Sequence, residues 1–383
     1  MFCNLDCGVK LMSEPDQAYN QFFEGKVRIP AGCAIAGLIN KGGKKVNGRT
    51  IVEMMAVMHE RSNGLGGGFA AYGIYPEYSK TYAFHLILAD DQIRKEVETL
   101  LTQTFKIIDQ QEIPVRRAGR YKKAPLVWCY FCDPLLRDGE ITVEELLLTT
   151  TMRINRLAPL ASVMSCGQDL GVFKGVGYPE EIAEFYRIDQ YQGYSWIGHG
   201  RFPTNTPGWW GGAHPFSLGE TAVVHNGELS SYGTNKNVLE NFGYELSLRT
   251  DTEVMAYAIH YLRRQNFSWP LVAKVLAPPH WAELERMPEP ERELYAVLRR
   301  VYGGLLMNGP FSIIVAFPGG LMALNDRLKL RSLVAGTSGA NLYLASEEAA
   351  IRQVCPRMED LWPLKAGEAL ICQMEEECTC HVA

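Results

Sequence analysis

Short apolar runs alternate with amphipathic stretches along this chain, and turns rich in glycine, proline and asparagine separate them. The run at 33–40 predicts a strand of small and branched residues. In the segment that follows, apolar residues spaced three and four apart share one face of a predicted helix: Ile51, Met54, Met55 and Met58. Thr50 and Glu53 have the spacing of a capping box at the start of that helix.

Strands predominate again towards the C-terminus. Five apolar runs follow one another closely, at 310–319, 320–326, 332–339, 341–346 and 369–374. Closely spaced runs of this kind favour antiparallel strands, and predicted helices flank them on both sides. We therefore expect an α+β fold in which two stacked antiparallel sheets lie between helical layers.

The segment 79–166 has a pattern of its own. It predicts four strands and two helices, at 81–89, 91–104, 105–116, 125–133, 141–157 and 161–166. Their order, βαββαβ, is the ferredoxin-like pattern. We expect an inserted α/β subdomain at 79–166 that interrupts a main domain over 33–383.

Composition excludes several classes of protein. The chain has 383 residues and a net charge of -5, and so lacks the basic footprint of a nucleic-acid-binding protein. The sequence has no apolar run close to the roughly 18 residues of a membrane span, and its first 20 residues are polar. We expect a cytoplasmic protein with no nucleic-acid or membrane partner.

The cysteines are expected to be reduced thiols in such a compartment. Cys129 and Cys132 form an isolated CxxC pair inside the apolar run at 125–133. A structural zinc site needs a second pair of ligands at matching spacing, and none follows. Buried core thiols are therefore the favoured interpretation of this pair.

Two loops resemble phosphate-binding sites only in part. The glycine-rich turn at 43–50 lies between a strand and a helix, but Arg49 stands where the motif needs lysine. The paired acids in the segment 86–92 end a strand without the glycine and threonine that would cradle a phosphate. Asp91 is expected there as the N-cap of the next helix.

The stretch 199–251 contains the side chains that could hold a zwitterionic amino acid. Arg201 could bind an α-carboxylate bidentately, although a surface ion pair is the simpler alternative. Asp251 could bind an α-ammonium group, or cap a helix, or do both. Asn226 and Gly227 could aim an amide and a backbone N–H at an oxyanion, but Asn-Gly is also a strong signal for a hairpin turn.

Cys33 is the candidate nucleophile that would act on an amino acid bound by these side chains. A cysteine in a small apolar strand is usually part of the core. It gains weight because a thiolate that attacks a carboxamide needs an oxyanion hole and a clamp on the substrate. The chain offers both elsewhere.

The motifs CxIAG, HERSNG, GHxRxxT…AHPF, VVHNGEL and TDTEV, in this order, resemble the class II (N-terminal nucleophile) glutamine amidotransferases. The resemblance covers roughly 33–75 and 167–260, and more loosely 305–372. RFPTNTPGWWGGAHPF with HNGELSSYGTNKN is most similar to the amidotransferase part of glutamate synthases. It implies the four-layer αββα sandwich of N-terminal-nucleophile hydrolases, with the ferredoxin-like segment inserted.

The resemblance also implies residue roles. Cys33 would be the nucleophile, with its own α-amino group as the base, and Asn226 and Gly227 would form the oxyanion hole. These would hydrolyse L-glutamine to glutamate and ammonia through a Cys33 thioester. His214 and His225 lie in matching motifs, but structural roles are at least as plausible for them.

For substrate binding, the resemblance assigns the glutamine α-carboxylate to Arg201 and Thr204. It assigns the α-ammonium group to Asp251 and places Arg61 near the nucleophile. In this family the nucleophile begins the mature chain, whereas residues 1–32 precede it here. We expect residues 1–32 to be a leader or propeptide that is cut between Gly32 and Cys33.

The ammonia acceptor is expected on a separate polypeptide. After residue 260 the sequence has no flavin-binding glycine motif and no iron–sulfur cysteine motif, so FMN and iron–sulfur clusters would belong to a partner, a glutamate synthase subunit. N-methylglutamate synthase is a close alternative. A hydrolase of another amide, or a non-catalytic regulatory subunit whose insert senses a ligand, also stays open.

Overall fold

The computed structural model describes residues 32–136, 141–202 and 208–374. Its largest sheet has seven antiparallel strands, in the order β17 (Asp360–Pro363), β15 (Val334–Ser338), β16 (Asn341–Ala345), β1 (Ala34–Asn40), β10 (Ser195–Gly200), β3 (Gly67–Tyr72) and β8 (Leu170–Gly175). A second antiparallel sheet has the order β11 (Phe216–Leu218), β12 (Thr221–Gly227), β13 (Phe311–Phe317), β14 (Gly320–Asn325) and β18 (Leu370–Gln373). A short ladder joins β2 (Val46–Asn47) to β9 (Gln192–Gly193).

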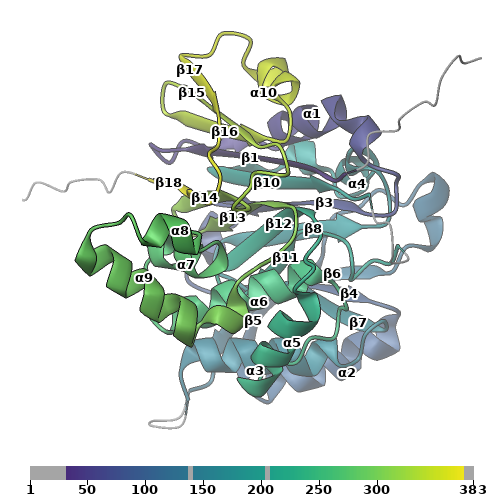
Figure 1. The fold of residues 1–383 in the computed structure, drawn as a ribbon. Helices are drawn as coiled ribbons and strands as arrows, with labels where there is room; N and C mark the ends of the chain where they lie inside the picture. Colours follow the sequence, from purple (N-terminus) through teal and green to yellow (C-terminus); the bar gives the residue numbers. More distant parts are fainter. Residues whose placement is uncertain (1–31, 137–140, 203–207, 375–383) are drawn as a thin grey trace, which may run out of the picture. The chain divides into compact units, whose positions relative to one another are not determined.

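The two large sheets pack face to face through β1 and β10 on one side and β12 and β13 on the other (Figure 1). The approach is close at Gly37, where an added Cβ would lie 3.2 Å from Ile314 Cγ2. Every residue of β1 and of β13 is buried. Burial on both faces explains why these strands appear in the sequence as unbroken apolar runs rather than as alternating ones.

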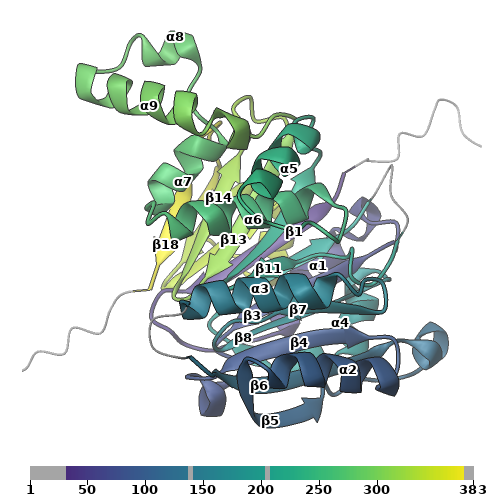
Figure 2. The same cartoon turned by 90° about the horizontal axis from the view of Figure 1, so that it is seen from below.

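Helices cover the outer face of each large sheet (Figures 1 and 2). Over the seven-stranded sheet lie α1 (Arg49–Val57), α4 (Pro179–Phe185) and α10 (Glu348–Val354). Against the five-stranded sheet packs α6 (Asp251–Arg264), with α5 (Tyr232–Asn241) and α7 (Trp269–Leu276) beside it. The chain continues through α8 (Trp281–Leu284) and α9 (Glu289–Val301). The expected four-layer αββα sandwich is confirmed.

The sequence 79–166 contains a third, four-stranded antiparallel sheet. Its order is β5 (Phe105–Glu112), β6 (Leu126–Pro134), β4 (Tyr82–Leu88) and β7 (Ala161–Ser165), with α2 (Asp91–Thr102) and α3 (Val143–Asn155) between strands. This is the βαββαβ arrangement that the sequence predicts. Along β4, Phe84 and Leu86 pack against the helices, whereas Ala83 and Ile87 pack into the core of the large sheets.

The same alternation separates the CxxC pair. Cys129 belongs to the core that the insert shares with the large sheets, whereas Cys132 belongs to the core beneath α2 and α3. Residues three apart on a strand point to opposite faces, so these two thiols cannot hold one ion together. Both are buried and free, as the favoured interpretation expects.

Two helix starts differ from the predictions. Gly48 is the N-cap of α1, and no side chain caps this helix, so the Thr50–Glu53 box is wrong. An added Cβ at Gly48 would lie 2.3 Å from the carbonyl oxygen of Ile188, so packing against a distant segment fixes this start. The N-cap of α2 is Asp90 rather than Asp91, since the Asp90 side chain accepts from the Ile93 N–H.

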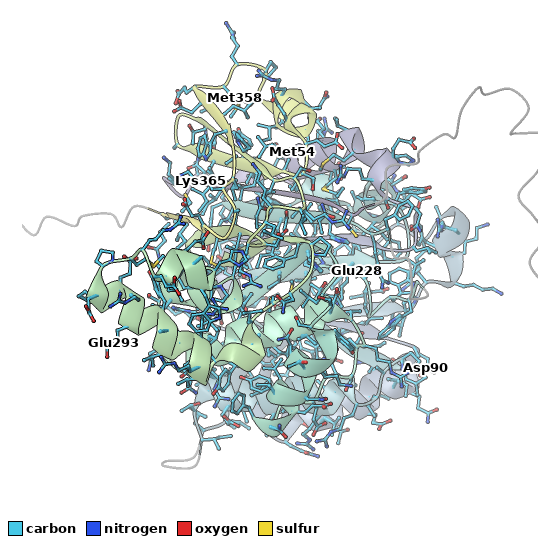
Figure 3. The ribbon with its side chains drawn as sticks, viewed as in Figure 1. Met54, Asp90, Glu228, Glu293, Met358 and Lys365 are labelled. Carbon is cyan, nitrogen blue, oxygen red and sulfur yellow. The ribbon has the colours of Figure 1, made fainter. Side chains whose placement is uncertain are left out.

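The predicted apolar face of α1 is buried, including Met54 (Figure 3). At the other extreme, α9 carries mostly exposed residues such as Glu293. Among the described residues, none of the helices combines the length and the apolar character that a membrane span requires.

Candidate active site

Cys33 lies immediately before the first residue of β1. Its Sγ accepts a hydrogen bond of 3.3 Å from the backbone N–H of Phe202. Burial raises the pKa of the Cys33 thiol and Asp251 adds to the rise, while the Phe202 hydrogen bond and the Arg201 and Arg331 guanidinium groups oppose it. The neutral thiol is therefore favoured, and an attack by this sulfur needs a base.

No histidine hydrogen-bonds this sulfur in the part of the chain that the structure describes. Of the two histidines on the strands that carry the site, His199 Nε2 lies 3.0 Å from the carbonyl oxygen of His225. His225 Nδ1 lies 3.1 Å from the hydroxyl of Thr252. The printed hydrogen bonds of both imidazoles go to other groups, while His199 Nδ1 and His225 Nε2 have no hydrogen-bond partner among the described residues. Neither ring holds the Cys33 thiol by a hydrogen bond in this structure.

Arg201 directly follows β10, the strand next to β1. Its backbone N–H donates to the carbonyl oxygen of Gly66, and the side chain is buried. Burial lowers the pKa of Arg201, and the nearby Cys33 and Asp251 partly restore it. A buried guanidinium near the Cys33 thiol and the Asp251 carboxylate is not a surface ion pair, so the simpler alternative for Arg201 is excluded.

Asn226 and Gly227 end β12 and pair with Ser312 and Phe311 of β13. Both residues are paired with β13, a strand about 85 residues further along the chain, so they do not form an Asn-Gly hairpin turn. Asn226 is fully buried, and neither polar atom of its side chain has a hydrogen-bond partner among the described residues. An unpaired buried amide is costly, so the amide is available for a ligand.

Gly227 is required at its position by both conformation and space. Its φ is 144°, and an added Cβ would lie 1.9 Å from the carbonyl oxygen of Pro310. Gly32 approaches the same amide from the Cys33 side, since its own added Cβ would lie 3.5 Å from Asn226 Oδ1. The peptide that joins Gly32 to Cys33 is therefore beside the candidate oxyanion hole.

This geometry gives a stability prediction. Gly227→Ala is expected to lower the free energy of unfolding by about 2 kcal/mol or more, because strain at positive φ adds to the clash with Pro310. Gly243 is a matched control, since it has a φ of 85° and no atom within 4 Å of an added Cβ. Urea denaturation measures both variants. Equal losses for Gly227→Ala and Gly243→Ala would contradict the packing argument.

Asp251 is the first residue of α6, and the N-cap is Thr250, whose side chain accepts from the Glu253 N–H. Asp251 is thus not the cap. Its Oδ2 accepts from the Leu229 N–H at 3.1 Å, and its Oδ1 lies 3.6 Å from His225 Nδ1. Burial raises its pKa, but His225 and the two backbone N–H groups outweigh burial and hold the pKa below its usual value. The carboxylate is therefore ionised and faces the site.

Three buried histidines, His199, His214 and His225, pack in a group next to the Asp251 carboxylate. His214 stacks on His199 with ring centroids 4.0 Å apart, and Thr252 lies between His214 Nε2 and His225 Nδ1 at 2.6 and 3.1 Å. Burial lowers the pKa of His199 to about 3 and that of His214 well below its usual value. Both are neutral structural groups, as the sequence allowed, whereas His225 contacts Asp251 directly.

Glu253 holds the loop before α6 in place. Its carboxylate accepts hydrogen bonds of 2.9 to 3.1 Å from the N–H groups of Ser247, Leu248 and Arg249. Burial raises its pKa to about 7, against the effect of these donors and of Lys174. Because the loop leads directly into Asp251, Glu253 fixes the position of the candidate ammonium-binding carboxylate.

Arg61 is near Cys33, but it already has partners. Its Nε lies 3.4 Å from the Cys33 carbonyl oxygen, and its NH1 donates to Glu347 at 2.8 Å. It therefore contacts the backbone of the nucleophile rather than an open substrate site. Thr204, predicted to share the α-carboxylate with Arg201, lies outside the described residues.

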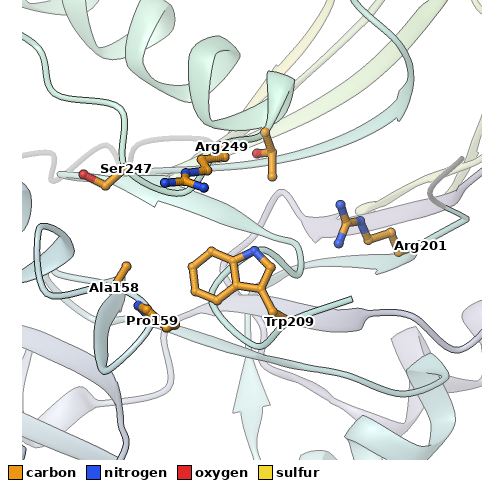
Figure 4. Close-up of a pocket in the computed structure, with 7 residues that line it drawn as sticks. Ala158, Pro159, Arg201, Trp209, Ser247 and Arg249 are labelled. Atoms are coloured by element: carbon orange, nitrogen blue, oxygen red, sulfur yellow. The ribbon is translucent and has the colours of Figure 1, made fainter. Parts of the chain in front are cut away.

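A cavity of about 340 Å³ opens beside Arg201. Figure 4 shows Arg201 and Arg249 on either side of the Trp209 indole, with Ala158 and Pro159 on another wall. Arg249 has a φ of 59°, an unusual conformation for a non-glycine residue. The insert, which carries no motif of the predicted chemistry, thus supplies part of the wall.

The structure brings Cys33, Arg201, Asn226, Gly227 and Asp251 together from four elements. Sequence reasoning missed the contributions of Phe202, Thr252, Glu253 and Glu347. Thr250 and Glu253 have capping-box spacing, which could have indicated the Glu253 role. The contacts of Phe202 and Glu347 depend on tertiary packing and leave no local signal.

Comparisons with known proteins give an independent indication of the family. A family model described as class II glutamine amidotransferases matches residues 148–381. An uncharacterized protein of Archaeoglobus fulgidus is 45% identical over 345 residues, covering 88% of this chain and 91% of that protein. The amidophosphoribosyltransferase of Pyrococcus horikoshii is 26% identical over 210 residues, covering 52% and 40% of the two chains. Among solved structures, the glutamine phosphoribosylpyrophosphate amidotransferase of B. subtilis aligns with 89% of this chain and 47% of its own, at 16% identity and a TM-score of 0.46.

Proposed function

Because the chain belongs to the class II glutamine amidotransferases, we propose that it hydrolyses L-glutamine to glutamate and ammonia through a thioester on Cys33. One observation carries the proposal: the Cys33 thiol, the unpaired Asn226 amide, the buried Arg201 and the ionised Asp251 converge on one site. Cys33 lies outside the range of the family model, so its role depends on this geometry.

The proposed steps use few groups. A base takes the proton of the Cys33 thiol, and the sulfur attacks the carboxamide carbon of glutamine. The oxyanion that develops accepts hydrogen bonds from the Asn226 amide and from the backbone N–H of Gly227. Ammonia leaves with the transferred proton, and water then hydrolyses the γ-glutamyl thioester to release glutamate and the thiol.

The base in this scheme is the α-amino group of Cys33. An α-amine titrates at a pH of about 8, which suits a general base at neutral pH. This requires removal of residues 1–32 by cleavage of the bond between Gly32 and Cys33. Two observations support the cleavage: that bond lies beside the candidate oxyanion hole, and none of the described histidines hydrogen-bonds the sulfur. Intact-mass measurement tests it, because full activity with residues 1–32 attached would contradict the mechanism.

The substrate clamp gives the test of glutamine specificity. Asp251→Asn is expected to raise the KM for glutamine about 10- to 100-fold, since a charge-assisted hydrogen bond contributes about 1.5 to 3 kcal/mol. Glu240→Gln on the exposed face of α5 is the control and should leave KM unchanged. Glutaminase assays of both variants decide the point. An unchanged KM in Asp251→Asn would indicate a hydrolase of another amide.

The ammonia acceptor in this proposal is a separate synthase subunit, most simply of a glutamate synthase that carries FMN and iron–sulfur clusters. The similarity of RFPTNTPGWWGGAHPF to glutamate synthases supports this choice. An exposed apolar face on α9, made by Leu294, Val297 and Val301, supports a protein partner.

The acceptor is tested by mixing the chain with the candidate synthase, glutamine, isotopically labelled 2-oxoglutarate and a two-electron reductant, and by identifying the labelled product by mass spectrometry. In a second mixture that also contains methylamine, formation of N-methylglutamate would identify the partner as an N-methylglutamate synthase instead. A chain that neither hydrolyses glutamine nor supplies ammonia to the synthase would support the non-catalytic regulatory alternative.

A further inference from the structure

A second cavity, of about 510 Å³, lies where the insert meets the main domain. The insert contributes the beginning of α3 and Tyr82. The main domain contributes the turn between β11 and β12, the C-terminal half of α6, the beginning of α7 and the turn between β13 and β14. None of the residues that line it belongs to the candidate active site.

One wall of this cavity is apolar and aromatic. Trp269 and Phe317 stack with ring centroids 4.1 Å apart and an interplanar angle of 22°, and Leu147 and Leu218 add aliphatic surface. Such a wall suits the hydrocarbon part of a small molecule.

Charged groups line the rest of the cavity, and they are mainly acidic. The two carboxylates are Glu144 of α3 and Glu220 of the β11–β12 turn. Arg263 is the basic group, but its guanidinium lies over the Trp269 ring at 4.6 Å and donates to the carbonyl oxygen of Phe267. A second arginine, Arg264, lies close enough to lower the pKa of Glu144, but it forms an ion pair with Glu145. Both arginines near the carboxylates are therefore already engaged by other groups.

His260 supplies an independent indication of a ligand. It is 4% exposed, and its Nδ1 lies 2.9 Å from the hydroxyl of Tyr244. The opposite nitrogen, Nε2, has no hydrogen-bond partner among the described residues and lies 3.6 Å from Glu144 Oε1. Because both His260 and Glu144 line the cavity, the unpartnered Nε2 is aimed into it.

We propose that this cavity binds a small organic ammonium compound. Its positive group would lie between Glu144 and Glu220, and its apolar body would lie against the wall formed by Trp269 and Phe317. This inference is independent of the proposed amidotransferase activity. It concerns binding alone and is tested by binding.

The acidic groups give the site a defined pH dependence. Burial raises the pKa of Glu220 to about 7, while the hydrogen bond that Glu220 accepts from the Gln168 N–H lowers it. Burial also raises the pKa of Glu144. Burial lowers the pKa of His260 to about 3, so this side chain is neutral near pH 7. The other titratable groups that interact with Glu220 have raised pKa values and stay neutral between pH 6 and 8: Tyr72, Tyr82, Cys166 and Tyr194.

The sign of the pH effect follows directly. Above pH 7 Glu220 is ionised and attracts the ammonium group. Below pH 7 it takes up a proton and the attraction is lost. An alkylammonium group stays charged throughout this range. Affinity should therefore fall as the pH is lowered from 8 to 6.

Isothermal titration of the purified chain with 2-phenylethylamine at pH 8 tests the proposal, with 2-phenylethanol as the neutral comparison. The amine is expected to bind at least about tenfold more tightly than the alcohol, which corresponds to the loss of one favourable charge interaction. Glu144→Gln and Glu220→Gln should each weaken amine binding about tenfold. Glu293→Gln, on the exposed surface of α9, should have no effect.

Three results would overturn the proposal: no binding of the amine at millimolar concentration, equal binding of amine and alcohol, or wild-type affinity in both glutamine variants. Glu220→Gln keeps an oxygen acceptor for the Gln168 N–H, so it is expected to fold. If it does not, Glu144→Gln still decides the question, because its side chain is 48% exposed.

Discussion

Cys33→Ala is expected to abolish glutamine hydrolysis, with a loss in kcat of about 10⁴-fold or more. Without the sulfur no thioester forms, and the remaining groups can only bind and polarise the amide. The variant should still bind glutamine, since Arg201 and Asp251 are untouched. A coupled assay for glutamate measures the first expectation, and calorimetry with glutamine measures the second.

The matched control is Cys355→Ala. Cys355 is partly exposed at the end of α10, and its thiol donates a hydrogen bond to the carbonyl oxygen of Arg357. This control should keep full activity. If Cys33→Ala retained more than a few per cent of wild-type kcat, the thioester mechanism would be wrong. If the proposed cleavage is carried out by Cys33 itself, the variant should also keep residues 1–32, which its intact mass would show.

The sequence predicts this fold well where one local feature decides the structure. Strands β1 and β13 are apolar throughout because both of their faces are buried, and that pattern is visible without coordinates. The insert could be predicted because its helices and strands follow one another in the order of a known motif. The start of α1 could not, because Gly48 is held against Ile188, about 140 residues away.

The candidate site shows the same limit more clearly. Local sequence cannot distinguish a hairpin at Asn226 and Gly227 from a strand end, since the partner strand β13 comes much later in the chain. The wall that Ala158 and Pro159 give to the cavity beside Arg201 depends on how the insert packs. Motif spacing pointed to the candidate side chains, whereas some of the groups that hold them, such as Phe202 and Glu347, depend on tertiary contacts.

Asn226→Ala is expected to reduce kcat about 10²- to 10³-fold while KM for glutamine changes little. The amide would act mainly on the oxyanion, which exists only in the transition state, so its loss affects the chemical step rather than binding. Asn226→Asp keeps the size of the side chain but places a negative charge beside the oxyanion, and should be at least as inactive. Steady-state kinetics with glutamine measures both variants.

Asn325→Ala is the matched control, because Asn325 is also fully buried, lies on β14 in the same sheet, and has an unpartnered Nδ2. Both alanine variants remove a buried amide and leave a small cavity. Asn325 Oδ1 accepts a hydrogen bond from Ser312 and Asn226 has no such partner, so Asn325→Ala should lose at least as much stability in urea denaturation. Only Asn226→Ala should lose kcat. Equal losses of kcat in the two variants would mean that Asn226 acts through packing, and the oxyanion hole would then have to be built from other donors.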